Sequence, residues 1–97
     1  MYDILPYTKQ RAKELDVIVK PSIKQKYKID VFDMFGNYIT SCGARNYFDY
    51  PHYMKMEKNG DLPPGYSTKR RILYHNRHKK EASNIGSRGY FSLNLLW

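Results

Sequence analysis

The sequence predicts an α+β fold in one domain spanning residues 1–97. A chain of 97 residues is long enough for one hydrophobic core and too short for two. Apolar and charged residues alternate over Tyr27–Val31, as in a half-buried strand, and Gly36-Asn37 supplies a turn that would pair this strand with the next. Residues 8–15 and 68–82 carry helix-capping signals, so we expect a helix on each side of a central hairpin or small sheet.

The N-terminal part of the chain predicts one short helix and one short strand. Thr8–Leu15 is expected to be helical, with Thr8 as its capping residue. Val17–Val19 is a β-branched run that favours an extended conformation, and Pro21 should end it.

The hairpin is the most clearly patterned element. Its second strand is expected at Tyr38–Cys42, immediately after the Gly36-Asn37 turn. With a two-residue turn, Phe35 pairs with Tyr38 and Val31 pairs with Cys42. This register places five side chains on one face, namely Ile29, Val31, Phe35, Tyr38 and Cys42.

The C-terminal half predicts a loop, a long helix and an apolar end. Residues 57–67 are rich in Gly and Pro and are expected to form a loop. A basic helix is expected from Thr68 to about Ala82, capped by Ser67 or Thr68. Gly86–Gly89 predicts neither a phosphate-binding loop nor the start of a helix. The apolar segment 89–97 must pack either on its own domain or on a neighbour.

Positive charge is concentrated in a basic C-terminal segment, residues 67–97. The whole chain has 17 Lys and Arg against 9 Asp and Glu, a formal net charge of +8. Residues 67–97 hold seven of these basic side chains and only one acidic side chain. An excess of this kind favours polyanionic partners such as nucleic acid or an acidic protein surface, although a solvated helix face has the same composition.

Cysteine content and hydropathy indicate a protein made in the cytosol. Cys42 is the single cysteine, so no intrachain disulfide can form, as is typical of reducing compartments. No apolar run reaches membrane-spanning length, and the first residues lack the order of a signal peptide. We therefore expect a soluble protein with no membrane insertion.

The sequence predicts no catalytic residue, metal, cofactor or small-molecule substrate. His75 and His78 could share a helix face, but three histidines and one cysteine match no zinc pattern and are expected to be ordinary polar residues. Cys42 lies in a predicted strand, where cysteine usually fills apolar space. No serine or carboxylate pair is placed convincingly beside a general base. We therefore expect a protein that binds a partner without catalysing a reaction.

Basic and aromatic residues remain as the candidate binding residues. The basic side chains could neutralise phosphates, with Tyr74 or Tyr90 stacking on bases. Residues 47–53 are the densest aromatic stretch and form either a buried corner or a docking surface. The candidate partner-binding residues are Arg70, Arg71, Arg77, Lys80, Arg88, Tyr47, Phe48, Tyr50, Tyr53, Tyr90, Leu95, Leu96 and Trp97.

Two C-terminal segments also resemble those of a known protein family. The pattern runs Arg-x2-Tyr-x2-Arg-His, then Gly-Tyr or Gly-Phe, then Leu-Leu-Trp. Here it is formed by Arg71, Tyr74, Arg77, His78, Gly89, Tyr90, Leu95, Leu96 and Trp97. In this pattern the chain resembles an uncharacterised family of small basic proteins encoded by large double-stranded DNA viruses of eukaryotes.

The resemblance implies a virion setting and no particular mechanism. It favours a non-enzymatic structural protein, such as a minor capsid protein that joins larger shell proteins. In that role residues 47–53 and Leu95-Leu96-Trp97 would be apolar anchors, and the basic residues would pair with acidic partner surfaces. The alternative is a non-specific nucleic-acid-binding protein that uses the same basic helix.

Overall fold

The protein is built from four α-helices, one 3₁₀-helix and a three-stranded antiparallel sheet, and the predicted α+β class is confirmed. The computed structural model describes all of residues 1–97. In chain order the elements are α1 (Pro6–Glu14), β1 (Ile18–Pro21), β2 (Tyr27–Phe32), β3 (Tyr38–Ala44), α2 (Tyr50–Lys58), α3 (Tyr66–Arg77), η1 (Lys79–Ser83) and α4 (Arg88–Leu96). None of these helices combines the length and apolar character needed to cross a membrane.

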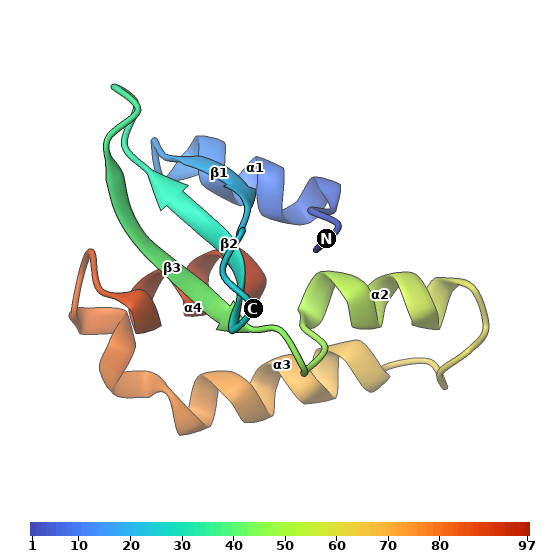
Figure 1. Cartoon of the computed structure of the whole chain (residues 1–97). Helices are drawn as coiled ribbons and strands as arrows, with labels where there is room; N and C mark the ends of the chain where they lie inside the picture. Colours follow the sequence, from blue (N-terminus) through green and yellow to red (C-terminus); the bar gives the residue numbers. More distant parts are fainter.

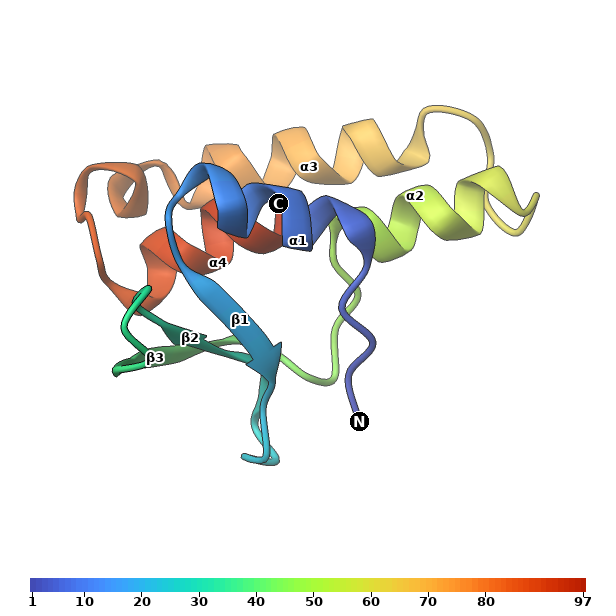
Figure 2. The same ribbon diagram turned by 90° about the horizontal axis from the view of Figure 1, so that it is seen from above.

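The elements form two layers. The strand order is β1-β2-β3, so β2 lies in the middle of the sheet. Helices α1 and α4 lie on one face of the sheet, while α2 and α3 pack side by side as a second helical pair (Figures 1 and 2). The turn of the β2–β3 hairpin projects away from both helical pairs (Figure 1).

The predicted hairpin forms, but in a different register from the one expected. Ile29 lies opposite Cys42 and Val31 lies opposite Thr40, with an irregularity between Val31 and Phe32. The connection spans residues 33–37, because the Asp33 carboxylate accepts hydrogen bonds from the backbone N–H groups of Phe35 and Asn37, each at 2.9 Å. A side-chain-stabilised turn therefore replaces the two-residue turn.

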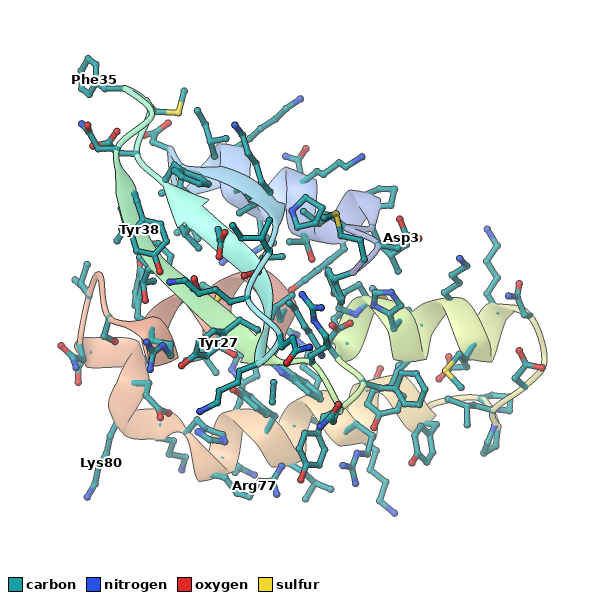
Figure 3. All side chains as sticks on the ribbon, in the orientation of Figure 1. Asp3, Tyr27, Phe35, Tyr38, Arg77 and Lys80 are labelled. Carbon is teal, nitrogen blue, oxygen red and sulfur yellow. The ribbon has the colours of Figure 1, made fainter.

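This register corrects the expected composition of the apolar face. Ile29, Val31 and Cys42 are fully buried on the helix-covered face, as predicted. Phe35 and Tyr38 are not part of that face, because the longer connection carries them outward, and they are 91% and 50% exposed. Figure 3 shows Phe35 at the outermost point of the hairpin.

Helix α1 begins earlier than predicted, and Thr8 is not its cap. Pro6 occupies the first turn, where its missing N–H costs nothing, and Leu5 is the N-cap residue without a side-chain bond. Thr8 instead is fully buried and donates a hydrogen bond to the carbonyl of Leu95 at 2.8 Å. The threonine therefore ties α1 to α4.

Helix α2 covers a segment expected to be a corner followed by a loop. Asp49 is its N-cap and accepts a hydrogen bond from the backbone N–H of His52 at 3.1 Å. Pro51 stands in the first turn, where proline is favoured. The predicted loop therefore begins later than expected, because its first residues, through Lys58, are helical.

Helix α3 starts before the predicted boundary and is shorter. Its N-cap is Gly65, in the left-handed region at φ 85°, so neither Ser67 nor Thr68 caps it. Ser67 is buried and donates hydrogen bonds from its backbone N–H and its Oγ to Glu57, which fixes the start of α3 against the end of α2. The α-helix ends at Arg77, and the chain tightens into η1 where one continuous helix was expected.

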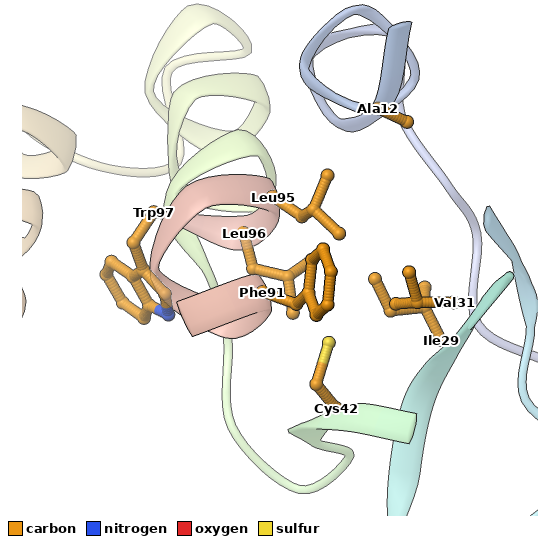
Figure 4. Close-up of a cluster of buried hydrophobic side chains, with 8 residues drawn as sticks. All are labelled: Ala12, Ile29, Val31, Cys42, Phe91, Leu95, Leu96 and Trp97. Atoms are coloured by element: carbon orange, nitrogen blue, oxygen red, sulfur yellow. The ribbon is translucent and has the colours of Figure 1, made fainter. Parts of the chain in front are cut away.

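The apolar C-terminal segment forms the helix at the centre of the core. Ser87 caps α4 through a hydrogen bond from the backbone N–H of Tyr90, at a place where no helix was predicted. Leu95 and Leu96 are fully buried, and Trp97 is 8% exposed. Figure 4 shows Leu95 on the side of α4 that faces the sheet and Trp97 on the opposite side. These residues are therefore core residues, which corrects their assignment as anchors for a partner.

Candidate functional site

Three adjacent hollows form a groove past the end of the sheet: the central one lies against α3, the second beside the β3–α2 connection, and the third beside η1 and the start of α4. The central hollow, of about 280 Å³, shares Lys28, Tyr47 and Phe48 with a second hollow of about 330 Å³. It shares Tyr74 and His78 with a third of about 380 Å³. The groove is lined by Tyr2, Lys26, Tyr27, Lys28, Gly43, Ala44, Arg45, Asn46, Tyr47, Phe48, Asp49, His52, Tyr53, Arg70, Tyr74, Arg77, His78, Glu81, Arg88, Gly89, Ser92 and Trp97.

A stack of three aromatic rings forms one wall of the central hollow. The rings of Trp97 and Tyr74 are nearly parallel, with centroids 4.3 Å apart, and the His78 ring lies 4.1 Å beyond Tyr74. Tyr74 and His78 meet because residues four apart share a face of a helix. The Tyr74 hydroxyl also lies 3.0 Å from Ser92 Oγ, so the wall is fixed to α4.

Cations greatly outnumber anions around the groove. Six Lys and Arg residues line it against two acidic residues, and no acidic residue lines the central hollow. In the central hollow the Arg70 guanidinium lies 5.8 Å from the centroid of the Tyr53 ring, and its Nε is buried without a hydrogen-bond partner. Arg77 is exposed and forms no salt bridge. The hollow is therefore suited to an anionic ligand.

Two exposed aromatic side chains stand at the junction of the central and second hollows. Tyr47 is 74% exposed and Phe48 is 55% exposed. They lie in the connection between β3 and α2, and the Phe48 ring contacts the Tyr53 ring at a centroid distance of 5.7 Å. Exposed rings beside arginines are the combination found in sites that bind unpaired nucleotides.

A buried polar cluster closes the other end of the groove. The fully buried Asp49 carboxylate accepts hydrogen bonds from Lys28 Nζ at 2.9 Å, from Tyr2 Oη at 2.5 Å and from His52 Nδ1 at 2.7 Å. Burial by itself raises the pKa of Asp49. The hydrogen bond from His52 and the charge of Lys28 outweigh that effect, so the pKa lies below its usual value. The cluster thus joins the N-terminus, β2 and α2 around one carboxylate.

The same carboxylate affects its tyrosine neighbour. Burial, followed by the charge of Asp49 and its hydrogen bond, raises the pKa of Tyr2, so the hydroxyl remains protonated and serves as a donor. The His52 ring also packs against the Tyr2 ring at a centroid distance of 5.1 Å. These contacts explain why the first residues of the chain lie against α2.

Comparison of the chain with protein-family models, with curated proteins and with solved structures finds no match. The function is therefore inferred from the groove and its surroundings. No three His, Cys, Asp or Glu side chains come close enough together to share a metal ion. Cys42 is buried under α4, and burial raises the pKa of its thiol to about 12.

The structure brings about half of the sequence-predicted binding residues together at the groove. From the aromatic segment these are Tyr47, Phe48 and Tyr53. From the basic segment they are Arg70 and Arg77 in the central hollow and Arg88 in the third. Trp97 lines the central hollow as well, as part of its wall. Figure 3 labels one side chain from each flank of the groove, Tyr27 from β2 and Arg77 from α3.

The other predicted binding residues have different roles. Arg71 donates a hydrogen bond to the carbonyl of Trp97 and lies over the Tyr50 ring, 5.1 Å from its centroid. Tyr50 in turn packs edge-on against Tyr7, and Tyr90 packs against Phe91 in the same way. Arg71, Tyr50 and Tyr90 therefore support the fold, as do Leu95 and Leu96.

Lys80 lies apart from the groove. It is exposed on η1 and points into solvent at a corner of the molecule (Figure 3). The basic helix predicted to continue through Lys80 to about Ala82 does not form as one element, because α3 ends at Arg77 and η1 follows it with a different geometry. Lys80 is therefore a suitable control for Arg77 in binding experiments, because it carries the same charge outside the groove.

Sequence reasoning missed several groove residues. Lys28 occupies a charged position in the alternation predicted for Tyr27–Val31, yet it is 4% exposed because it is buried against Asp49. His78 was assigned as an ordinary polar helix residue, and His52 was not among the candidate binding residues. The sequence contained one usable signal, since Asp49 followed by Pro51 is a helix N-terminus pattern that would have placed His52 beside the carboxylate.

Proposed function

We propose that this protein binds single-stranded nucleic acid in the groove and acts as a binding component, without catalysis, in the virion setting that the viral resemblance suggests. The observation that carries the proposal is the central hollow, where exposed aromatic rings and arginines meet and no acidic side chain is present. Phosphates are neutralised by arginine and lysine, and unpaired bases stack on aromatic rings. A nucleotide presents its phosphate and its base a short distance apart, and the groove offers a surface for each.

Charge complementarity extends along the groove beyond the central hollow. Lys26 and Arg88 line the third hollow, and Arg45 lines the second. Arg45 and Arg88 donate hydrogen bonds to backbone carbonyls through their Nε atoms, which holds their positive charge in fixed positions. A strand lying along the groove would pass these cations in sequence.

Removing groove charges should weaken nucleic-acid binding and make it less sensitive to salt. In the double variant Arg70→Gln/Arg77→Gln we expect affinity for a labelled single-stranded oligonucleotide to fall by about tenfold or more at low salt. The slope of log K against log salt should become shallower by roughly 0.7 for each phosphate that the variant no longer neutralises. Fluorescence anisotropy titrations across a salt series measure both quantities.

The matched control removes the same charge elsewhere. Lys9→Gln/Lys13→Gln changes two exposed lysines of α1, which do not line the groove. Circular dichroism should confirm that both double variants are folded. Equal losses of affinity in the two variants would mean that only net charge matters, and the proposed groove would be rejected.

A second function, as a minor capsid protein that contacts larger shell proteins, is favoured by the hairpin tip. Phe35 is 91% exposed and Met34 is 60% exposed in the connection between β2 and β3, and Phe35 lies at the tip of this hairpin (Figure 3). Exposed apolar side chains of this kind are suited to protein docking. Washing virus particles with about 1 M salt distinguishes the two functions, because charges more than about 3 Å apart are then screened from one another. A shell component would stay attached, whereas a nucleic-acid-bound protein would be released.

A further inference from the structure

We propose that the central hollow is a pocket for one unstacked nucleotide, with its base against Phe48 and its phosphate on Arg70 and Arg77. This inference rests on the proposed function and narrows it to a ligand and a binding mode. A base inside a duplex has both faces covered by its neighbours, so only an unpaired or flipped-out nucleotide could use the pocket. The protein would then select single strands over duplexes without reading sequence.

The phosphate position follows from the two arginines. The Arg70 guanidinium is held against the Tyr53 ring, and its buried Nε has no acceptor within the protein. Arg77 lines the same hollow from farther along α3 and forms no salt bridge. A phosphate suits planar, unpaired guanidinium groups, because it can accept two parallel hydrogen bonds from each.

The base position follows from the aromatic residues that line the same hollow. Phe48 is held by the Tyr53 ring and is still 55% exposed, so its ring can be covered by a ligand. Tyr47, 74% exposed, precedes it in the chain and lines the same pocket. The Trp97–Tyr74–His78 stack forms a wall of the pocket and is already occupied by its own ring contacts. Phe48 and Tyr47 are therefore the free rings of the pocket, and Phe48 is the one that a neighbouring ring holds in place.

The size of the hollow limits the ligand to one nucleotide. Its volume of about 280 Å³ lies just below the usual range of ligand pockets, which is roughly 300 to 1,000 Å³. The neighbouring nucleotides of a strand would continue into the second and third hollows, which share walls with the first. A nucleoside monophosphate should therefore bind on its own, although more weakly than an oligonucleotide.

Trp97 provides a direct reporter, because it is the only tryptophan of the chain and lines the pocket. We expect adenosine 5′-monophosphate to change Trp97 fluorescence saturably, with a Kd below about 1 mM. Adenosine and inorganic phosphate should each bind at least about tenfold more weakly, since each offers only one of the two contacts. Phe48→Ala should weaken monophosphate binding by about tenfold, the loss expected for one base–aromatic stack.

Two exposed residues outside the pocket give matched controls. Phe35→Ala removes an exposed phenylalanine from the hairpin tip, and Lys80→Gln removes a positive charge from η1. Neither should change monophosphate affinity. Equal binding of phosphate and monophosphate, or no effect of Phe48→Ala, would overturn the pocket. Oligonucleotide binding without monophosphate binding would overturn this inference alone, whereas the absence of both would overturn the proposed function as well.

Discussion

Replacing Asp49 by asparagine is expected to lower the free energy of unfolding by about 3–5 kcal/mol at neutral pH, the usual cost of removing one partner of a buried ion pair. The carboxylate is fully buried and lies 2.9 Å from Lys28 Nζ, and Lys28 itself is 4% exposed. Without the carboxylate, a buried ammonium group keeps no counter-charge. Urea denaturation followed by circular dichroism measures the change in stability.

The same variant should show a distinct dependence on pH. The pKa of Asp49 is lower in the folded protein than its usual value near 3.9, so its stabilising contribution is complete above about pH 4 and is lost as the pH falls through the folded-state value. The difference in stability between wild type and Asp49→Asn should therefore shrink below about pH 4. Asp33 and Glu57 also have lowered pKa values. Because both residues are present in the two proteins, their contributions cancel when one stability is subtracted from the other.

An exposed ion pair is the control for the buried one. Glu14→Gln removes the Arg11–Glu14 pair on α1, where both side chains are partly exposed, and should change stability by no more than about 1 kcal/mol. If Asp49→Asn cost no more than Glu14→Gln, the buried cluster would not organise the N-terminus, β2 and α2 as described.

Replacing Leu96 by alanine is expected to destabilise the fold by about 2–5 kcal/mol, the range found when a buried leucine is truncated. Leu96 is fully buried in the cluster between α4 and the sheet (Figure 4), and its Cδ1 lies against Gly43 of β3. Gly43 has φ 81°, and a Cβ there would lie 2.5 Å from Leu96, so α4 and β3 approach closely at this point. Thermal and urea denaturation both measure the effect.

An exposed aliphatic residue serves as the comparison. Ile85→Ala removes a side chain that is 79% exposed and should change stability by less than about 0.5 kcal/mol. Near-wild-type stability of Leu96→Ala would mean that the C-terminal segment is not part of the core. The sequence-based assignment of Leu95-Leu96-Trp97 as partner anchors would then be reinstated.

Local patterns predicted the hairpin and the overall class, because the strand alternation, a turn signal and the capping signals of two helices can all be read from residues close together in the sequence. The register was not predictable in the same way, since the Asp33 side chain stabilises a longer connection than Gly36-Asn37 alone suggests. Helix α4 was not predicted because its apolar side chains pack against two different surfaces. Leu95 faces the sheet while Trp97 packs against rings of α2 and α3, so no single apolar stripe marks the helix (Figure 4).

The groove could be predicted in part from composition. Arg70, Arg77 and Phe48 were candidates because basic and aromatic residues are the usual nucleic-acid ligands. Lys28 could not be found in this way, because its burial depends on Asp49, which is 21 residues away in the chain. Long-range contacts of this kind follow from the packing of whole elements, which no local pattern encodes.

Photochemical crosslinking tests the central claim most directly. A single-stranded oligonucleotide is bound to the wild-type protein at low salt and irradiated, and the crosslinked peptides are identified by mass spectrometry. Binding in the groove predicts crosslinks at Tyr47 and Phe48, which should become several-fold weaker in Arg70→Gln/Arg77→Gln at an oligonucleotide concentration close to the wild-type Kd. Crosslinks confined to the hairpin tip around Phe35, or spread over the surface without preference, would contradict the groove as the nucleic-acid site.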